Sequence, residues 1–213
     1  TYRQSSVATD DVLEKDQFNQ YYARAPRTRL SAEQLRDQAL AVSGLLSSKM
    51  YGPSVMPYQP KGIWNSAYSN ADWKQSEGED QYRRGVYTYW KRTSAYPAML
   101  TFDATAREVC VARRIRTNTP LQALVLLNDS VYVEAANHLA VNMKKSGGTT
   151  SDHIAWGYKA AMKKPITPMK SEALENLYNE ALRGYEGEED GEMQAMQLVS
   201  AAILNLDEFV TRN

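Results

Sequence analysis

Four arginines stand close together just before a predicted helix, and they are the strongest candidates for chemistry in this chain. With the two residues that follow them, the candidate anion-binding set is Arg107, Arg113, Arg114, Arg116, Asn118 and Thr119. An arginine binds a carboxylate or a phosphate through paired hydrogen bonds. The free N–H groups at a helix N-terminus also favour an anion. These residues therefore predict an anion site at the start of the helix that begins near Thr119.

The arginines also have a structural interpretation, which the sequence favours: they hold neighbouring loops together without a ligand. Their partners would then be backbone carbonyl groups and the carboxylates of Asp103, Glu108 and Asp129.

The ligand-binding interpretation adds aromatic side chains that could stack against a sugar ring. These are Tyr58, Trp64, Trp73 and Trp90. Asp103 would be the acid or base of a hydrolytic version. This interpretation requires the arginines, the aromatic side chains and Asp103 to converge on one concave site. Whether the chain is an enzyme stays open.

Other kinds of site find little support in the residues. Cys110, His138 and His153 are far apart in sequence, so we expect no zinc site. Cys110 is not part of a C-x-x-C-H motif, so we expect no covalently attached haem and no other cofactor in this chain. The acidic run 186–192 lacks the alternating ligands of an EF-hand loop. There is no nucleophile elbow, P-loop or dinucleotide-binding motif.

The charge is balanced overall but uneven along the chain. Lys and Arg number 25, Asp and Glu number 25, and the formal net charge is zero, so nothing favours nucleic acid or an anionic membrane as a partner. Segment 83–116 is strongly basic and segment 172–192 strongly acidic. We expect these segments to face each other or solvent. No apolar stretch approaches the roughly 20 residues of a transmembrane helix.

Helix signals are clearest in two places. Ser31 and Gln34 have the spacing of a capping box, which predicts a helix from Ser31 to about Leu46. Thr119 and Gln122 have the same spacing with a proline between them, which predicts a second capping box. The apolar residues of this second helix point to most sides, so it should be deeply buried: Leu121, Leu124, Val125 and Leu127.

The remaining patterns define a mainly α fold. A break near residues 128–130 and further helix starts near Ser151 and Thr167 predict a bundle of four or five helices over 119–206. Segment 50–80 reads as a long loop rich in proline and aromatic residues. Segment 84–93 is the best strand candidate, with 53–58 as its partner in a small two-stranded element. We expect a single domain, with a helix plus irregular or β region at 1–118 and a helical bundle at 119–213.

The sequence over residues 87–129 resembles a known family. The stretch 116–124, which reads RTNTPLQAL, is its most specific motif. Supporting pieces lie at 2–6, 29–30, 36–37, 52–55, 57–60, Gly62, Trp64 and 204–209. The chain is similar to the planctomycete-type C-terminal domain of unknown function that accompanies c-type cytochrome domains in large exported proteins.

The resemblance implies a location and partners rather than an activity. It implies a periplasmic, cell-surface or secreted protein, in which this chain is the C-terminal part of a larger chain. The partners would be the other domains of the parent protein, including a c-type cytochrome domain. Our leading hypothesis is a non-catalytic scaffold or interaction module. The alternatives are an anion- or carbohydrate-binding or hydrolytic domain, and a domain that shields a neighbouring haem through an exposed apolar patch.

Overall fold

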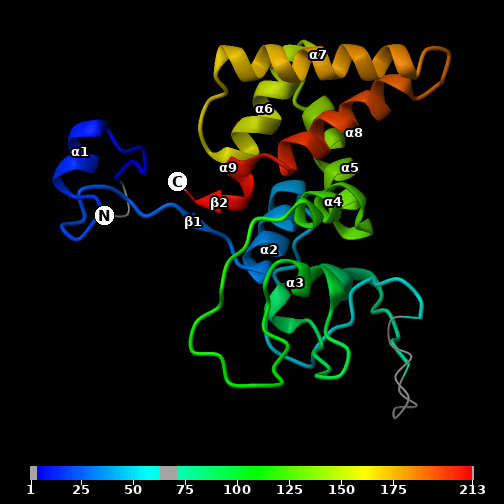
Figure 1. The fold of residues 1–213 in the computed structure, drawn as a ribbon. Helices are drawn as coiled ribbons and strands as arrows, with labels where there is room; N and C mark the ends of the chain where they lie inside the picture. The colour runs from blue at the N-terminus through cyan, green and yellow to red at the C-terminus, as the bar shows by residue number, and fades with distance from the viewer. Residues whose placement is uncertain (1–3, 63–71, 213) are drawn as a thin grey trace.

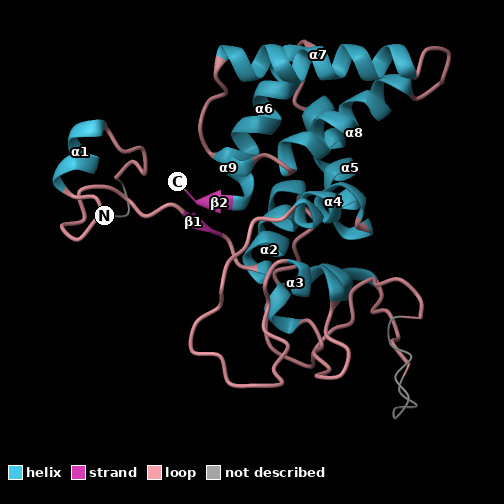
Figure 2. Ribbon diagram, in the orientation of Figure 1, coloured by secondary structure: helices cyan, strands magenta, loops and turns pink. Residues whose placement is uncertain are grey.

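The computed structural model describes residues 4–62 and 72–212 of the chain. The described part is mainly helical, as predicted, with one small antiparallel sheet (Figures 1 and 2). Its α-helices are α1 (Asp10–Lys15), α2 (Ala32–Ser43), α3 (Pro97–Thr101), α4 (Pro120–Asn128), α5 (Ser130–Lys145), α6 (Thr150–Met162), α7 (Pro168–Gly184), α8 (Gly191–Leu204) and α9 (Asp207–Val210). Two 3-10 helices are η1 (Gly78–Tyr82) and η2 (Gly85–Tyr87), and the strands are β1 (Thr28–Arg29) and β2 (Thr211–Arg212).

The helical bundle forms where the sequence predicts it, as the five helices α4 to α8. Asp129 ends α4 and caps α5 by accepting a hydrogen bond from the Val131 N–H at 3.0 Å. Thr149 and Asp152 form a capping box at the start of α6. Helix α8 packs against both α5 and α7, and its inner residues carry the core of the domain.

The capping box predicted at Ser31 is confirmed. The Ser31 side chain accepts from the Gln34 N–H, and the Gln34 side chain accepts from the Ser31 N–H at 3.0 Å. Helix α2 ends earlier than Leu46, because Gly44 adopts a left-handed conformation with φ of 81° that turns the chain away. Helix α2 packs on α3 and α5, so it connects the helical bundle to the loops below it (Figure 1).

The predicted loop is present over its described residues 50–62 and 72–77, while residues 63–71 lie outside the described part; the predicted strand at 84–93 is wrong. That segment begins with η2 and makes one isolated parallel bridge, from Thr88 to Val55, in the partner segment that we expected. A Cβ on Gly85 would lie only 3.0 Å from the Cα of Glu33, so α2 packs closely against the start of this segment. The two-stranded sheet lies elsewhere: β1 pairs antiparallel with β2, which brings the segment before α2 next to the C-terminal end of the described chain.

Two further features of the arrangement are clear in Figure 1. Helix α1 buries none of its residues and lies apart from the body, on the segment that leads into β1. The basic segment 83–116 and the acidic segment 172–192 lie at opposite ends of the molecule, so they do not face each other (Figure 1). Within the described ranges, no helix has the length and apolar character needed to cross a bilayer.

Candidate functional site

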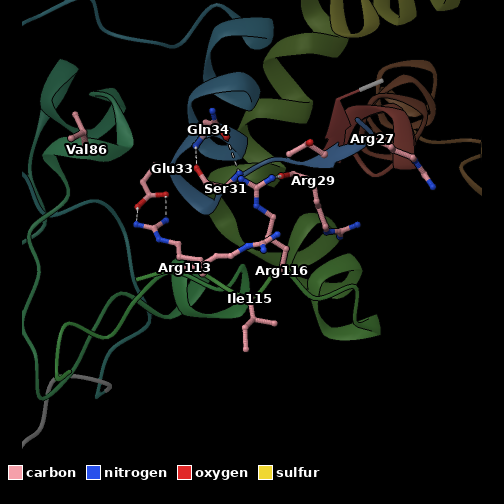
Figure 3. A pocket seen from close by; sticks show the side chains of 11 residues that line it. Arg27, Arg29, Ser31, Glu33, Gln34, Val86, Arg113, Ile115 and Arg116 are labelled. Carbon is pink, nitrogen blue, oxygen red and sulfur yellow. Dashed lines mark hydrogen bonds and ion pairs between the residues drawn. The ribbon is translucent and has the colours of Figure 1, made fainter. Parts of the chain in front are cut away.

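An open groove of about 1320 Å³ lies where β1, the start of α2 and the loop before α4 meet (Figure 3). We call it the Arg groove. Its lining residues are Arg27, Thr28, Arg29, Ser31, Glu33, Gln34, Val86, Arg113, Arg114, Ile115 and Arg116. Segments that are far apart in the sequence therefore bring five arginines and one glutamate to one surface.

A buried glutamine holds the walls of the Arg groove together. Gln122 of α4 is 1% exposed. Its amide oxygen accepts a hydrogen bond from Arg29 at 2.8 Å, and its amide nitrogen donates to the Thr101 carbonyl at 2.9 Å and to the Thr117 hydroxyl at 3.1 Å. Asp103 in turn accepts from the Thr117 N–H at 2.7 Å. This network fixes β1, α3, α4 and the loop 113–116 relative to one another.

Besides Arg29, which donates to Gln122, three more of the five arginines have partners that hold them in place. Arg114 makes two hydrogen bonds to Glu33, at 2.8 and 3.0 Å, which are drawn as dashed lines in Figure 3. Arg116 donates to the Arg29 carbonyl at 2.5 Å, and Arg27 pairs with Asp207. Burial raises the pKa of Glu33, but hydrogen bonds, chiefly from Arg114, outweigh this and lower its pKa overall.

Arg113 is the fifth arginine of the lining. It is exposed, and within the described residues it makes no hydrogen bond or ion pair. The lining also keeps a net positive charge, because Glu33 is the one acid among its five arginines. The Arg groove can therefore accept carboxylates from outside, with Arg113 as a free donor and Arg116 and Arg29 as oriented ones.

The structure brings half of the predicted anion-binding residues into this groove. Arg113, Arg114 and Arg116 line it, whereas Asn118 and Thr119 are exposed and do not. Arg107 lies outside the groove with its guanidinium over the Trp90 ring, 5.2 Å from the ring centroid. Thus the arginines gather at the N-terminus of α2, and not at the start of α4 as the sequence predicts.

Two predictions about α4 are wrong. Thr119 is the N-cap residue, but its side chain makes no capping hydrogen bond, because Gln122 turns inward to the network described above. The helix is also not deeply buried: Leu121 is 57% exposed, Leu124 55% and Leu127 42%. Only Gln122 and Leu126 of α4 are buried.

The predicted aromatic residues do not join the arginines. Tyr58 lines a separate small cavity of about 330 Å³ with Tyr82 and Glu134. Trp73 stacks on Tyr96 with ring centroids 6.0 Å apart, and its indole donates to the Pro57 carbonyl at 2.8 Å.

The remaining members of the hydrolytic constellation are also placed elsewhere. Trp90 donates to the Ala106 carbonyl at 3.3 Å, and Trp64 lies outside the described residues. Asp103 is occupied by Thr117 and is therefore positioned to fix a loop. In residues 4–62 and 72–212, no cluster of three or more His, Cys, Asp or Glu residues is arranged to hold a metal ion.

Sequence reasoning missed the other half of the Arg groove. The wall opposite the loop 113–116 is formed by Arg27, Arg29 and Glu33. Glu33 and Arg29 lie more than 80 residues before their partners Arg114 and Arg116 in the sequence. The capping box at Ser31 did locate the helix start that lines the groove. Nothing in a single sequence, however, pairs that helix start with Arg114.

The chain matches one family model over residues 1–178, and that family is described as PSD1, a protein of unknown function (DUF1553). The chain belongs to this family. No curated protein and no solved structure matches it. The PSD1 match contains every residue that lines the Arg groove and ends within α7. The structure continues past this point, since α8 and β2 complete the core and the sheet of this PSD1 domain.

Proposed function

We propose that this PSD1 domain is a non-catalytic interaction module and that its Arg groove binds an acidic segment of another polypeptide. The observation that carries the proposal is the gathering of five arginines against one glutamate on a single open surface. Carboxylates are the groups that such a surface recognises, because a guanidinium presents two parallel donors to them.

The shape of the Arg groove favours a polypeptide over a small molecule. Small-molecule sites are concave pockets of roughly 300–1,000 Å³ that enclose most of the ligand. The Arg groove is larger and open to solvent, and its arginines are spread over segment 27–29 and the loop 113–116. A chain of several carboxylates can reach these separated donors at once, whereas a single phosphate cannot.

A hydrolytic site has weaker support. That alternative needs aromatic side chains and an acid or base beside the arginines. Tyr58, Trp73 and Trp90 lie outside the groove lining, and Asp103 is hydrogen-bonded to Thr117. The described residues therefore favour recognition over catalysis.

The setting that we propose for the module comes from the sequence resemblance over residues 87–129. We place it in a multidomain protein of the cell envelope, at the periplasmic or outer face or in a secreted form. There the acidic segment belongs to another domain of the parent protein, and the c-type cytochrome domain is the first candidate. The chain itself needs no cofactor for this role.

Binding of a labelled acidic peptide tests the proposal. A fluorescein-labelled 12-residue peptide of alternating Glu and Ser is titrated with the chain, and its fluorescence anisotropy is recorded at about 50 mM and about 300 mM NaCl. We expect saturable binding that weakens with salt, because exposed charges are screened over about 10 Å at 0.1 M ionic strength. Arg113→Glu should weaken peptide binding at least about tenfold, because the variant replaces a free guanidinium by a carboxylate that repels the acidic peptide.

The matched control is Lys159→Glu, which makes the same charge change on an exposed residue of α6 outside the groove lining. We expect it to leave the affinity within about twofold. Equal losses for both variants would mean that the peptide senses only net charge. That result, or an absence of binding to the parent chain, would refute the proposed function.

A further inference from the structure

Helix α4 presents an apolar face to solvent that its neighbours in the domain do not cover. Leu121, Leu124 and Leu127 recur at every third residue and are 57%, 55% and 42% exposed. The opposite face is closed by Gln122 and Leu126, which are buried. A helix that is apolar on all sides is normally enclosed. In the described structure, one apolar side of α4 is therefore exposed to solvent.

The helix that carries this leucine face follows the loop of the Arg groove directly in the chain. The groove loop runs from Arg113 to Arg116 and enters α4 after three further residues. Ile115, in the middle of that loop, is 80% exposed and points away from Glu33 (Figure 3). Gln122 fixes α4 to Arg29 of the groove by a hydrogen bond of 2.8 Å. Helix α4 and the loop that carries the free Arg113 are thus held together through Arg29 as one unit.

We infer that the partner is an amphipathic helix whose apolar face covers α4 and whose carboxylates, along one flank, enter the Arg groove. This inference rests on the proposed function and names the kind of segment that the groove receives. Two features decide it: the leucines demand an apolar stripe, and the adjacent arginines demand acids beside that stripe. Neither an acidic coil nor an uncharged apolar helix satisfies both.

The dimensions of α4 suit a helix as the partner. Its nine residues span about 13 Å, which is two to three turns. A stripe of leucines on each of two helices interdigitates at an axis separation of about 8–10 Å. A membrane surface would cover the exposed leucines, but a flat surface does not enter the Arg groove as a flank of carboxylates does. A second copy of the chain is the competing occupant that the experiment must exclude.

Three synthetic 18-residue helical peptides test the inference. The first carries leucines at helical spacing with glutamates on the flanks. In the second, glutamines replace the leucines, and in the third, glutamines replace the glutamates. We expect the first peptide to bind the chain at least about tenfold more tightly than either of the others. If the second peptide binds as tightly as the first, the inference fails and the proposed function stands. If neither acidic peptide binds, both fail.

Variants of the chain place the binding on α4. Leu124→Gln should weaken binding of the first peptide at least about fivefold and leave the second peptide unaffected. The matched control is Leu198→Gln, because Leu198 is a leucine of α8 that is 43% exposed. Equal effects of the two variants would overturn the inference.

Two further measurements address the other occupants. Light scattering on a sizing column gives the mass of the chain alone, and co-sedimentation measures its binding to vesicles with about 30% anionic lipid. We expect a monomer and no vesicle binding. A dimer that Leu124→Gln dissociates would make a second copy the occupant, and vesicle binding that Leu124→Gln abolishes would make it a membrane. Either result would overturn the inference.

Discussion

Helices α4 and α8 have similar apolar sequences and opposite environments. Helix α8 packs between α5 and α7 and buries seven of its residues. Helix α4 buries two, and one of those is the glutamine of the groove network. An apolar pattern therefore predicts that a helix packs against something. It does not tell whether the same chain or a partner supplies the contact. In α8 the cover is this domain, and in α4 we assign it to a partner.

The largest difference between the two helices should appear when a core side chain of α8 is truncated. Ile203 is fully buried within the central cluster. Ile203→Ala should lower the free energy of unfolding by about 2–5 kcal/mol, because it removes buried methyl groups and leaves a cavity. Urea denaturation followed by circular dichroism measures the change. A loss below about 1 kcal/mol would mean that α8 is not the core element that we describe.

A smaller loss is expected for the residue that joins α4 to the Arg groove. Gln122→Ala removes hydrogen bonds to Arg29, Thr101 and Thr117 from a buried position. The cost should be about 1–3 kcal/mol, because buried partners are left unsatisfied. Binding of the acidic peptide should weaken as well, because Arg29 and the loop lose their anchor.

The matched control for this variant is Gln75→Ala, since Gln75 is exposed and its side chain, among the described residues, hydrogen-bonds only to the side chain of Gln81. It should change stability by less than about 0.5 kcal/mol. If Gln122→Ala lowers the free energy of unfolding no more than Gln75→Ala does, the network does not fix the groove.

A smaller, pH-dependent change in stability is expected when Glu208 of α9 is replaced. Glu208 accepts hydrogen bonds from Tyr158 and from Lys170 at 2.5 Å, and it pairs with Lys164 at 3.3 Å. Partial burial raises the pKa of Glu208, but these partners outweigh it and lower the pKa to about 2. A carboxyl with a lowered pKa stabilises the fold above its ordinary value of 4.5, and this contribution is lost as the pH falls toward 2.

Glu208→Gln should therefore be less stable than the parent chain at pH 7 by about 0.5–1 kcal/mol, the range of partly exposed ion pairs. The gap should close between pH 4.5 and about 2, where the parent carboxyl becomes protonated. Thermal unfolding of both proteins across this range measures the gap. A gap that does not change with pH would contradict the assignment of the ion-pair network.

The smallest effect on stability is expected for the leucine face of α4. Leu124→Gln replaces an exposed leucine by a residue of similar helix propensity. It should change the free energy of unfolding by no more than about 0.5 kcal/mol. A loss comparable to that of Ile203→Ala would show that α4 is covered within the domain after all. The comparison with α8 would then fail.

Local sequence signals predicted much of the helical fold. The capping box at Ser31 and the cap at Asp129 fix helix boundaries through contacts within a few residues, and Pro168 is the first residue of α7, near the predicted start at Thr167. These contacts are readable because capping chemistry depends on sequence spacing alone. The same rule failed at Thr119, since Gln122 found stronger partners at distant residues than at its own helix end.

The Arg groove could be predicted only in part. Its basic loop was visible as a cluster of arginines, because neighbouring residues in sequence are neighbours in space. The opposing wall was not, because the pairing of Arg114 with Glu33 and of Arg116 with the Arg29 carbonyl joins residues more than 80 positions apart. The exposure of α4 was also unpredictable, because periodicity tells which residues are apolar and not whether the domain has another layer to cover them.

Methyl NMR of the chain with the leucine-and-glutamate helical peptide tests the central claim most directly, since it observes both helices in one spectrum. We predict that the peptide shifts the methyl signals of Leu121, Leu124, Leu127 and Ile115. The methyl signals of Ile203 and Leu204 in α8 should stay in place, because these residues are buried away from the partner. Binding of the peptide without any change at the α4 leucines and Ile115 would contradict the account.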